Sequence, residues 1–451
     1  MEGKRPLRGI RGPSVKYVVF FVAMLGMPAL AFILMLNRRW LKWVYWGMAA
    51  ALCVYIPTSI NFFSHERYRG SSRGMEVSVL HLLACAALGS LALRGKKVQW
   101  FPDWGSRIYL VYFLLCLPSL GTAANLLYSW FEVWKMLLLP LLFAAVYNYL
   151  KTTDDLATVT GALAGFTTVN ALVAAKQHFG GVYQAYGVFP HQNSMAMGML
   201  LMGSLFFAGY LSGGLKGWIG KLRGMAFAGA GLATMLTYSR GAMAMLPVGF
   251  GVAGLLCLIG GRTRGWMLRL APVVLLGMAV LYEMLPQIIE RFTTAPDASG
   301  ETRVELALCA REMIKDEPLR GIGINNWGVK INEPYDYAER AGRHTNRGED
   351  FKDGIVETVY LLVGAECGLP ALAAMLAWFG WYGVACLRLA RRLRRTPDYW
   401  VPAGLAGGLL VSYAQSALEW VLRQQVNLFL LVFCFAILAY LDKRRPAARV
   451  A

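Results

Sequence analysis

Positively charged side chains stand where apolar stretches of this 451-residue chain end. Arg240 occupies a tight turn between two apolar runs, and Arg303 follows Thr302 in a capping-box pattern that predicts a helix start. Guanidinium groups match phosphate oxygens in geometry and keep their charge. With Lys135, near the start of another apolar run, they predict a positive cavity for a lipid-embedded anion such as a polyprenyl diphosphate.

Simpler interpretations exist for these positions. An arginine at the end of a membrane span can extend to the lipid headgroups. Arg303 could instead pair with Glu301 or Glu305 on its own helix, and Lys135 could anchor a span at the membrane interface. A free helix N-terminus beside Arg303 would favour phosphate.

Further polar side chains lie near the same boundaries. Glu357 opens the apolar run after the long polar stretch, where partial desolvation would suit a general base, although a solvated helix-end carboxylate is the alternative. Tyr360 follows it and is expected to contact substrate, as is Arg311, which lies two turns beyond Arg303. Asn193 is expected to cap the next helix and, together with His191, to contact substrate in the cavity.

Metal or cofactor sites are not visible in the pattern. The five histidines lack metal-ligand spacing, and the eight cysteines form no CxxC pair. The chain also lacks a phosphate-binding Walker loop and the GxSxG and HExxH motifs. We therefore expect chemistry that uses no metal and no cofactor.

The elements that must position these residues are membrane spans. The chain is 57% hydrophobic and only 16% charged, whereas a soluble domain carries about 25% charged residues. Thirteen apolar runs approach the length of about 20 residues that crosses a bilayer. They cover residues 15–36, 42–62, 75–94, 107–128, 131–150, 156–179, 194–213, 225–238, 242–260, 267–285, 357–390, 401–419 and 426–441. The prediction is an all-α polytopic membrane protein with 12–13 transmembrane helices.

The same pattern predicts the domain organisation. Residues 1–285 form N-terminal transmembrane helices, 286–356 one large, partly helical extramembrane loop, and 357–451 the C-terminal helices. The net charge is +19, but the excess lies in short clusters between spans, which indicates cytoplasmic anchors and argues against nucleic acid as a partner. The turn at Arg240, the segment before residue 194 and the large loop then face the opposite, periplasmic side.

Several motifs in this order resemble those of the O-antigen ligase superfamily, which also contains O-antigen polymerases and protein O-oligosaccharyltransferases. A segment similar to the family's NPLxGxG lies at 316–323, and one similar to AETGLxG at 365–370. The remaining matches are Pro190-His191-Gln192-Asn193, Ser239-Arg240-Gly241 and the Ser299 to Arg303 segment that opens the large loop.

The resemblance implies a GT-C-like membrane glycosyltransferase of the bacterial inner membrane. Such enzymes move a glycan from undecaprenyl diphosphate to an acceptor hydroxyl on a glycan, on the lipid A-core or on a protein. The transfer takes place in the periplasm and without metal. Carried over to this sequence, Arg240 and Arg303 would bind the diphosphate and stabilise it as a leaving group.

One departure concerns the base. The family's ligases carry a His-Asn pair at a spacing that falls here on Glu357-Thr358. Either Glu357 replaces the histidine, or His344 reaches in from the loop. We favour Glu357, because a helix start is better defined than a glycine-rich loop.

Three functions fit these expectations to different degrees. A polysaccharide or O-antigen ligase is the leading hypothesis, and a polymerase of the same superfamily is the alternative within the class. A small-anion transporter is the alternative from another class. A transporter would place polar groups near mid-membrane, whereas here they gather at one face.

Overall fold

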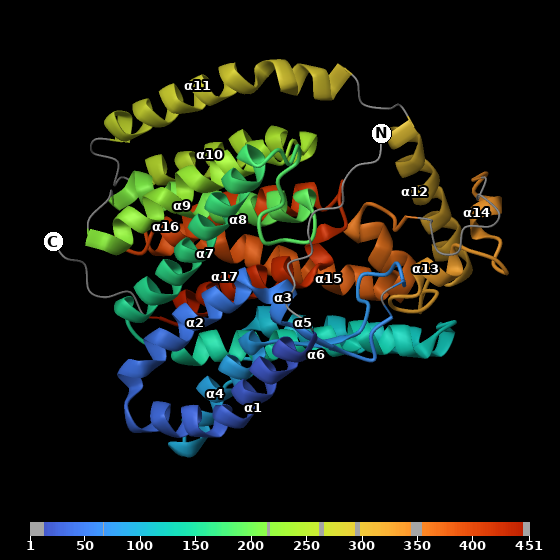
Figure 1. Cartoon of the computed structure of the whole chain (residues 1–451), viewed down its shortest axis with the longest axis horizontal. Helices are drawn as coiled ribbons and strands as arrows, with labels where there is room; N and C mark the ends of the chain where they lie inside the picture. Colours follow the sequence, from blue (N-terminus) through green and yellow to red (C-terminus); the bar gives the residue numbers. More distant parts are fainter. Residues whose placement is uncertain are drawn as a thin grey trace.

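The computed structural model of the chain describes residues 13–65, 67–213, 217–260, 266–293, 298–343 and 354–444. These residues form long helices packed side by side, with one short antiparallel strand pair among them (Figure 1). The strands are β1 (Ile60–Phe62) and β2 (Met75–Val77), paired with Asn61 opposite Glu76. The predicted all-α polytopic class is confirmed.

The helices coincide with the predicted apolar runs. The N-terminal half contains α1 (Pro13–Leu36), α2 (Leu41–Cys53), α3 (Tyr55–Thr58), α4 (Val79–Leu93), α5 (Trp104–Cys116), α6 (Leu126–Tyr149), α7 (Thr153–Phe179) and α8 (Gln192–Gly213). The next helices are α9 (Gly217–Leu236), α10 (Arg240–Ile259) and α11 (Trp266–Thr293). The C-terminal helices are α15 (Val359–Arg392), α16 (Trp400–Gln415) and α17 (Gln425–Lys443), and short 3-10 turns are η1 (Arg38–Trp40), η2 (Leu117–Thr122) and η3 (Val421–Arg423).

Within the described residues, seven helices are long and apolar enough to cross a membrane: α1, α6, α7, α8, α10, α15 and α17. The other six predicted runs also contain helices, but α2, α4, α5 and α16 have only 13 to 16 residues. At 1.5 Å per residue these extend about 20–24 Å, less than the ~30 Å hydrocarbon core. Part of the apolar run at 42–62 instead forms β1.

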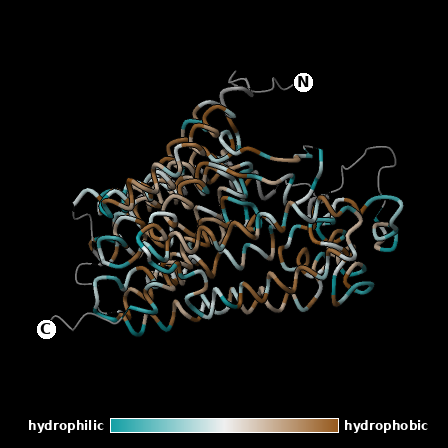
Figure 2. Tube along the Cα trace, turned by 90° about the horizontal axis from the view of Figure 1, so that it is seen from below, coloured by the Kyte–Doolittle hydropathy of each residue, from teal (hydrophilic) through white to brown (hydrophobic). Residues whose placement is uncertain are grey.

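The large loop between α11 and α15 is folded against the bundle. It contains α12 (Ala298–Asp316), α13 (Trp327–Lys330) and α14 (Tyr337–Arg340), which lie beyond one end of the bundle (Figure 1). A separate apolar core joins this loop to α15. Its members include Leu306, Cys309, Met313, Trp327, Ile331, Leu362 and Ala365. Hydrophilic residues are dense on the loop helices and at the opposite end of the bundle (Figure 2).

The loop is fixed to α15 at a break in that helix. Gly368 has φ 83° and Pro370 has no N–H, so the carbonyls of Ala365 and Glu366 lose their helical donors. The backbone N–H groups of Ile322 and Gly323 donate to these two oxygens at 2.9 and 3.1 Å. The two motifs near 320 and 367 therefore form one structural unit.

Candidate functional site

An arginine held between two carboxylates forms the centre of the candidate site. Arg303 of α12 contacts the carboxylate of Glu357 through Nε, and its Nη2 lies 3.2 Å from Oε1 of Glu419. Glu357 lies just before α15, and Glu419 lies in the segment between α16 and α17. Three segments far apart in sequence thus meet at one guanidinium.

The position of Arg303 differs from the predicted one. The helix begins at Ala298, so Arg303 is inside α12 and Thr302 does not cap it. Glu301 lies in the first turn, where an acidic residue favours the helix dipole and supports this earlier start. The alternative ion pair of Arg303 with Glu301 or Glu305 is not formed among the described residues, where Glu305 pairs with Arg343 at 3.1 Å.

The start of α8 supplies two more polar groups. Nδ2 of Asn193 donates to Oε1 of Glu419 at 2.7 Å. Asn193 therefore does not cap α8 as predicted. Its backbone N–H instead donates to Nδ1 of His191 at 3.3 Å, so the imidazole has the capping role. His191 is exposed beside this cluster.

Arg240 starts α10 at the same end of the bundle. The first turns of α8, α10 and the last turns of α16 share a small apolar cluster of Ala196, Leu200, Ala242, Leu246 and Val411. A Cβ at Gly241 would meet the side-chain amide of Gln415, one turn before Glu419. Arg240 is half-buried, and among the described residues its side chain forms no hydrogen bond or ion pair.

The electrostatics of the cluster favour a proton near neutral pH. Burial and the neighbouring Glu357 carboxylate raise the pKa of Glu419 to about 7, against the lowering effects of Arg303 and Asn193. Partial desolvation lowers the pKa of His191, while the charge of Glu357 acts in the opposite direction. The site therefore contains a carboxyl group that titrates in the physiological range.

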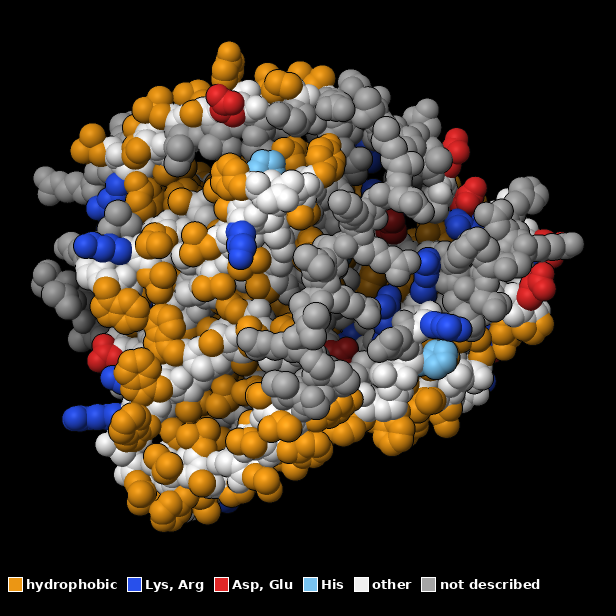
Figure 3. All heavy atoms as spheres, viewed as in Figure 1, with side chains coloured by type: hydrophobic (Ala, Val, Ile, Leu, Met, Phe, Trp, Pro, Cys, Tyr) orange, Lys and Arg blue, Asp and Glu red, His pale blue; other side chains and the backbone are white. Residues whose placement is uncertain are grey.

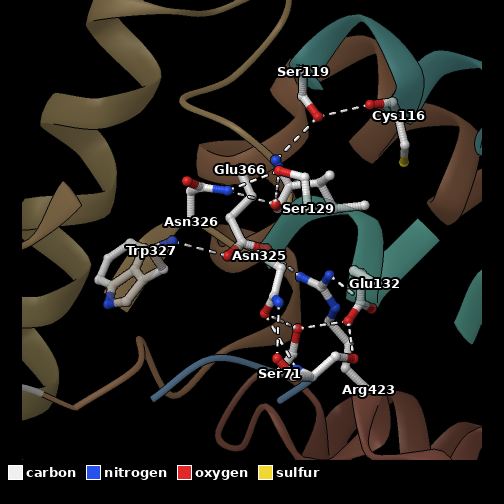
Figure 4. A network of polar contacts seen from close by, with 12 residues as sticks. Ser71, Cys116, Ser119, Ser129, Glu132, Asn325, Asn326, Trp327, Glu366 and Arg423 are labelled. Carbon is white, nitrogen blue, oxygen red and sulfur yellow. Dashed lines mark hydrogen bonds and ion pairs between the residues drawn. The ribbon is translucent and has the colours of Figure 1, made fainter. Parts of the chain in front are cut away.

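A second network of polar side chains is buried between α6, α15 and η3 (Figure 4). Arg423 of η3 bridges Glu132 of α6 at 3.0 Å and Glu366 of α15 at 2.7 Å. Lys135, 1% exposed, pairs with Glu132 at 2.7 Å and donates to the backbone oxygen of Arg423 at 2.8 Å. This network fixes the segment that carries Glu419 relative to the start of α15.

Lys135 consequently does not line a cavity with the two arginines, contrary to the prediction. A lysine inside an apolar helix requires a nearby counter-charge, and Glu132 provides it one turn away. Tyr360 is also occupied, since its hydroxyl donates to the backbone oxygen of Tyr413 at 2.7 Å. Arg311 is exposed and, among the described residues, forms no hydrogen bond or ion pair with Glu357 or Glu419. His344 lies outside the described residues.

Sequence reasoning missed Glu419 and Arg423. Both follow a long apolar run in a stretch with few other charges. An ionisable residue at the edge of such a run is itself a signal of function or of buried pairing. Spacing alone could not identify their partners, which lie 57 to 291 positions earlier in the chain.

Comparison with known proteins identifies part of the chain. Residues 225–376 match the family model described as O-Antigen ligase. This range includes Arg240, Arg303 and Glu357, whereas Asn193 and Glu419 lie outside it. No curated protein matches the chain. The family match supports, over residues 225–376, the resemblance to the O-antigen ligase superfamily that the motifs indicate.

Proposed function

We propose that this protein is a glycosyltransferase that moves a glycan from undecaprenyl diphosphate to an acceptor hydroxyl, as a polysaccharide or O-antigen ligase. The supporting observation is the group formed by Arg303, Glu357 and Glu419, with Arg240, which has no partner among the described residues, at the same end of the bundle. Cations for a diphosphate and a carboxylate for a hydroxyl proton are the groups that such a transfer requires.

In the proposed reaction, the acceptor oxygen attacks the anomeric carbon of the donor sugar. The bond between that carbon and the diphosphate oxygen breaks, and the electron pair leaves with the diphosphate. The hydroxyl proton passes to the carboxylate of Glu357, which is 36% exposed and therefore accessible. Arg240 and Arg303 bind the departing diphosphate and neutralise the charge that develops on it.

Glu419 has a different part in this scheme. The Glu419 side chain is 9% exposed and contacts both Arg303 and Asn193. It therefore keeps the Arg303 guanidinium in position when the diphosphate displaces Glu357 from that guanidinium. The exchange frees the Glu357 carboxylate to act as the base. This order of events couples donor binding to activation of the acceptor.

A transfer assay with purified protein in vesicles tests the assignment. We expect Arg303→Ala and Arg240→Ala each to lower the transfer rate by about 100-fold or more, the loss typical of a removed transition-state donor. Arg388→Ala, at the opposite end of α15, is the matched control and should retain activity. Full activity in either site variant would reject the diphosphate-binding role.

The same assay tests which residue is the base. Glu357→Gln should be far less active than His344→Ala, and the reverse order would assign the base to His344.

Gene deletion followed by gel analysis of surface glycans separates the candidate reactions. Loss of lipid A-bound polymer, with lipid-linked polymer intact, is expected for a ligase whose site faces the periplasm. Accumulation of single repeat units would indicate a polymerase instead. Unchanged glycans would argue for transport.

A further inference from the structure

The segment between β1 and β2 presents arginines at the end of the bundle where the large loop packs. We refer to residues 63–74 as the arginine loop, of which residue 66 lies outside the described part. Arg67, Arg69 and Arg73 are all exposed on it. Within the described residues, the side chains of Arg67 and Arg73 form no hydrogen bond or ion pair. Figure 3 shows several Lys or Arg side chains and a histidine on the right-hand part of the face in view, while other basic side chains lie at its left edge.

The arginine loop is held rigidly, although it contains little regular structure. The ring of Tyr68 is fully buried and stacks on Tyr128 with 3.9 Å between centroids, and its hydroxyl donates to the backbone oxygen of Asn325. Nδ2 of Asn325 donates in turn to the backbone oxygen of Ser72 at 2.9 Å. The N–H of His65 closes the loop by donating to the oxygen of Arg73 at 2.8 Å.

The loop shares its anchor with the candidate site. The hydroxyls of Ser71 and Ser72 donate to Oε2 of Glu132 at 2.8 and 2.6 Å. Glu132 also pairs with Arg423, which lies four positions after Glu419. One buried carboxylate therefore joins the arginine loop to the segment that carries part of the proposed reaction centre.

We propose that the arginine loop is the binding site for the acceptor, and that the acceptor glycan carries phosphate or carboxylate groups. This assignment rests on the proposed function, which already gives the donor diphosphate to Arg240 and Arg303. Because the backbone of the loop is already fixed, binding an anion orders only the arginine side chains and not the loop itself. The loop lies beyond the ends of α3 and α4, at the end of the bundle where the large loop packs (Figure 1).

The test compares the triple variant Arg67→Ala/Arg69→Ala/Arg73→Ala with Arg388→Ala/Arg391→Ala at the opposite end of α15. Calorimetry measures binding of a phosphorylated acceptor oligosaccharide, without donor, to protein in nanodiscs of neutral lipid. We expect the triple variant to bind about 10-fold or more weakly, and the control to bind like the wild type. In transfer assays the acceptor KM should rise while the donor KM stays constant. A dephosphorylated acceptor should remove the difference between wild type and variant.

Several outcomes would overturn the assignment. Equal acceptor affinity in the triple variant and the wild type would reject it while leaving the proposed function intact. Lost affinity only for vesicles that contain phosphatidylglycerol would mean that the arginine loop binds bulk anionic lipid. If the wild type neither transfers glycan nor binds the acceptor, the proposed function and this assignment fail together.

Discussion

Two arginines in this molecule each lie between two glutamates, and they differ in their access to solvent. Arg423 bridges Glu132 and Glu366 with side chains that are at most 6% exposed. Arg303 bridges Glu357 and Glu419, and its side chain is 38% exposed. The same ionic arrangement therefore occurs once inside the protein and once at its surface.

The difference in exposure indicates a structural role for the Arg423 network and a reactive role for the Arg303 cluster. Around Arg423 the charges are balanced by Lys135, and the carboxylates have further donors, the hydroxyl of Ser72 among them. A ligand cannot replace a member of this network, because the displaced charged group would remain buried without a partner, which costs several kcal/mol. Around Arg303, Glu357 reaches solvent and can be replaced by the phosphate of a ligand. The exposed cluster is thus suited to a reaction, and the buried one to holding it in place.

The largest expected effect tests this division. Arg423→Gln leaves two carboxylates buried without their cation, so it should lower the free energy of unfolding by about 3–5 kcal/mol. Arg303→Gln, at the partly exposed cluster, should lower it by less than about 1 kcal/mol while abolishing transfer. Reversible unfolding in detergent micelles measures both. Similar stability losses in the two variants would contradict the division.

A smaller effect concerns pH. The carboxyl of Glu419 has a pKa of about 7 and holds Arg303 best when ionised. Transfer by the wild type should therefore fall as the pH drops through 7, because protonation removes the negative charge. In Glu419→Gln the rate should be about 10-fold lower at high pH, the loss of a charged hydrogen bond, and should lack this step. A variant that keeps the step would assign it to another group.

Functional candidates at the ends of the polar loop could be predicted from the sequence, whereas contact partners on distant helices could not. Arg303 and Glu357 stand out because polar residues flank an apolar run there, and the structure brings them into contact. Lys135 does not lie where the pattern predicts, because Glu132 one turn earlier on α6 pairs with it. A cation in an apolar helix is as compatible with such buried pairing as with ligand binding. Glu419 could not be placed, since helix packing between α8, α12 and α16 determines its neighbours.

Helix-capping patterns in the sequence also failed to predict the contacts of individual side chains. The Thr302–Glu305 pattern fits a helix start, but α12 begins one turn earlier, and Asn193 donates to Glu419 where a cap was expected. Capping patterns report what a side chain can do locally, whereas a buried carboxylate nearby offers a stronger partner. The helical class and the positions of the apolar runs followed from hydropathy, which does not depend on such partners.

The smallest expected effect on transfer is that of Tyr360, which lies between Glu357 of the exposed cluster and Glu366 of the buried network in the sequence. Its hydroxyl donates to the oxygen of Tyr413, one of the last carbonyls of α16, where helical donors run out. Tyr360→Phe should therefore cost about 1 kcal/mol of stability and change the transfer rate by less than about 2-fold. Unfolding and transfer measured on the same preparation distinguish the two roles. A large loss of transfer at unchanged stability would make Tyr360 a substrate-binding residue, as the sequence predicted, and would extend the reactive region to the first turn of α15.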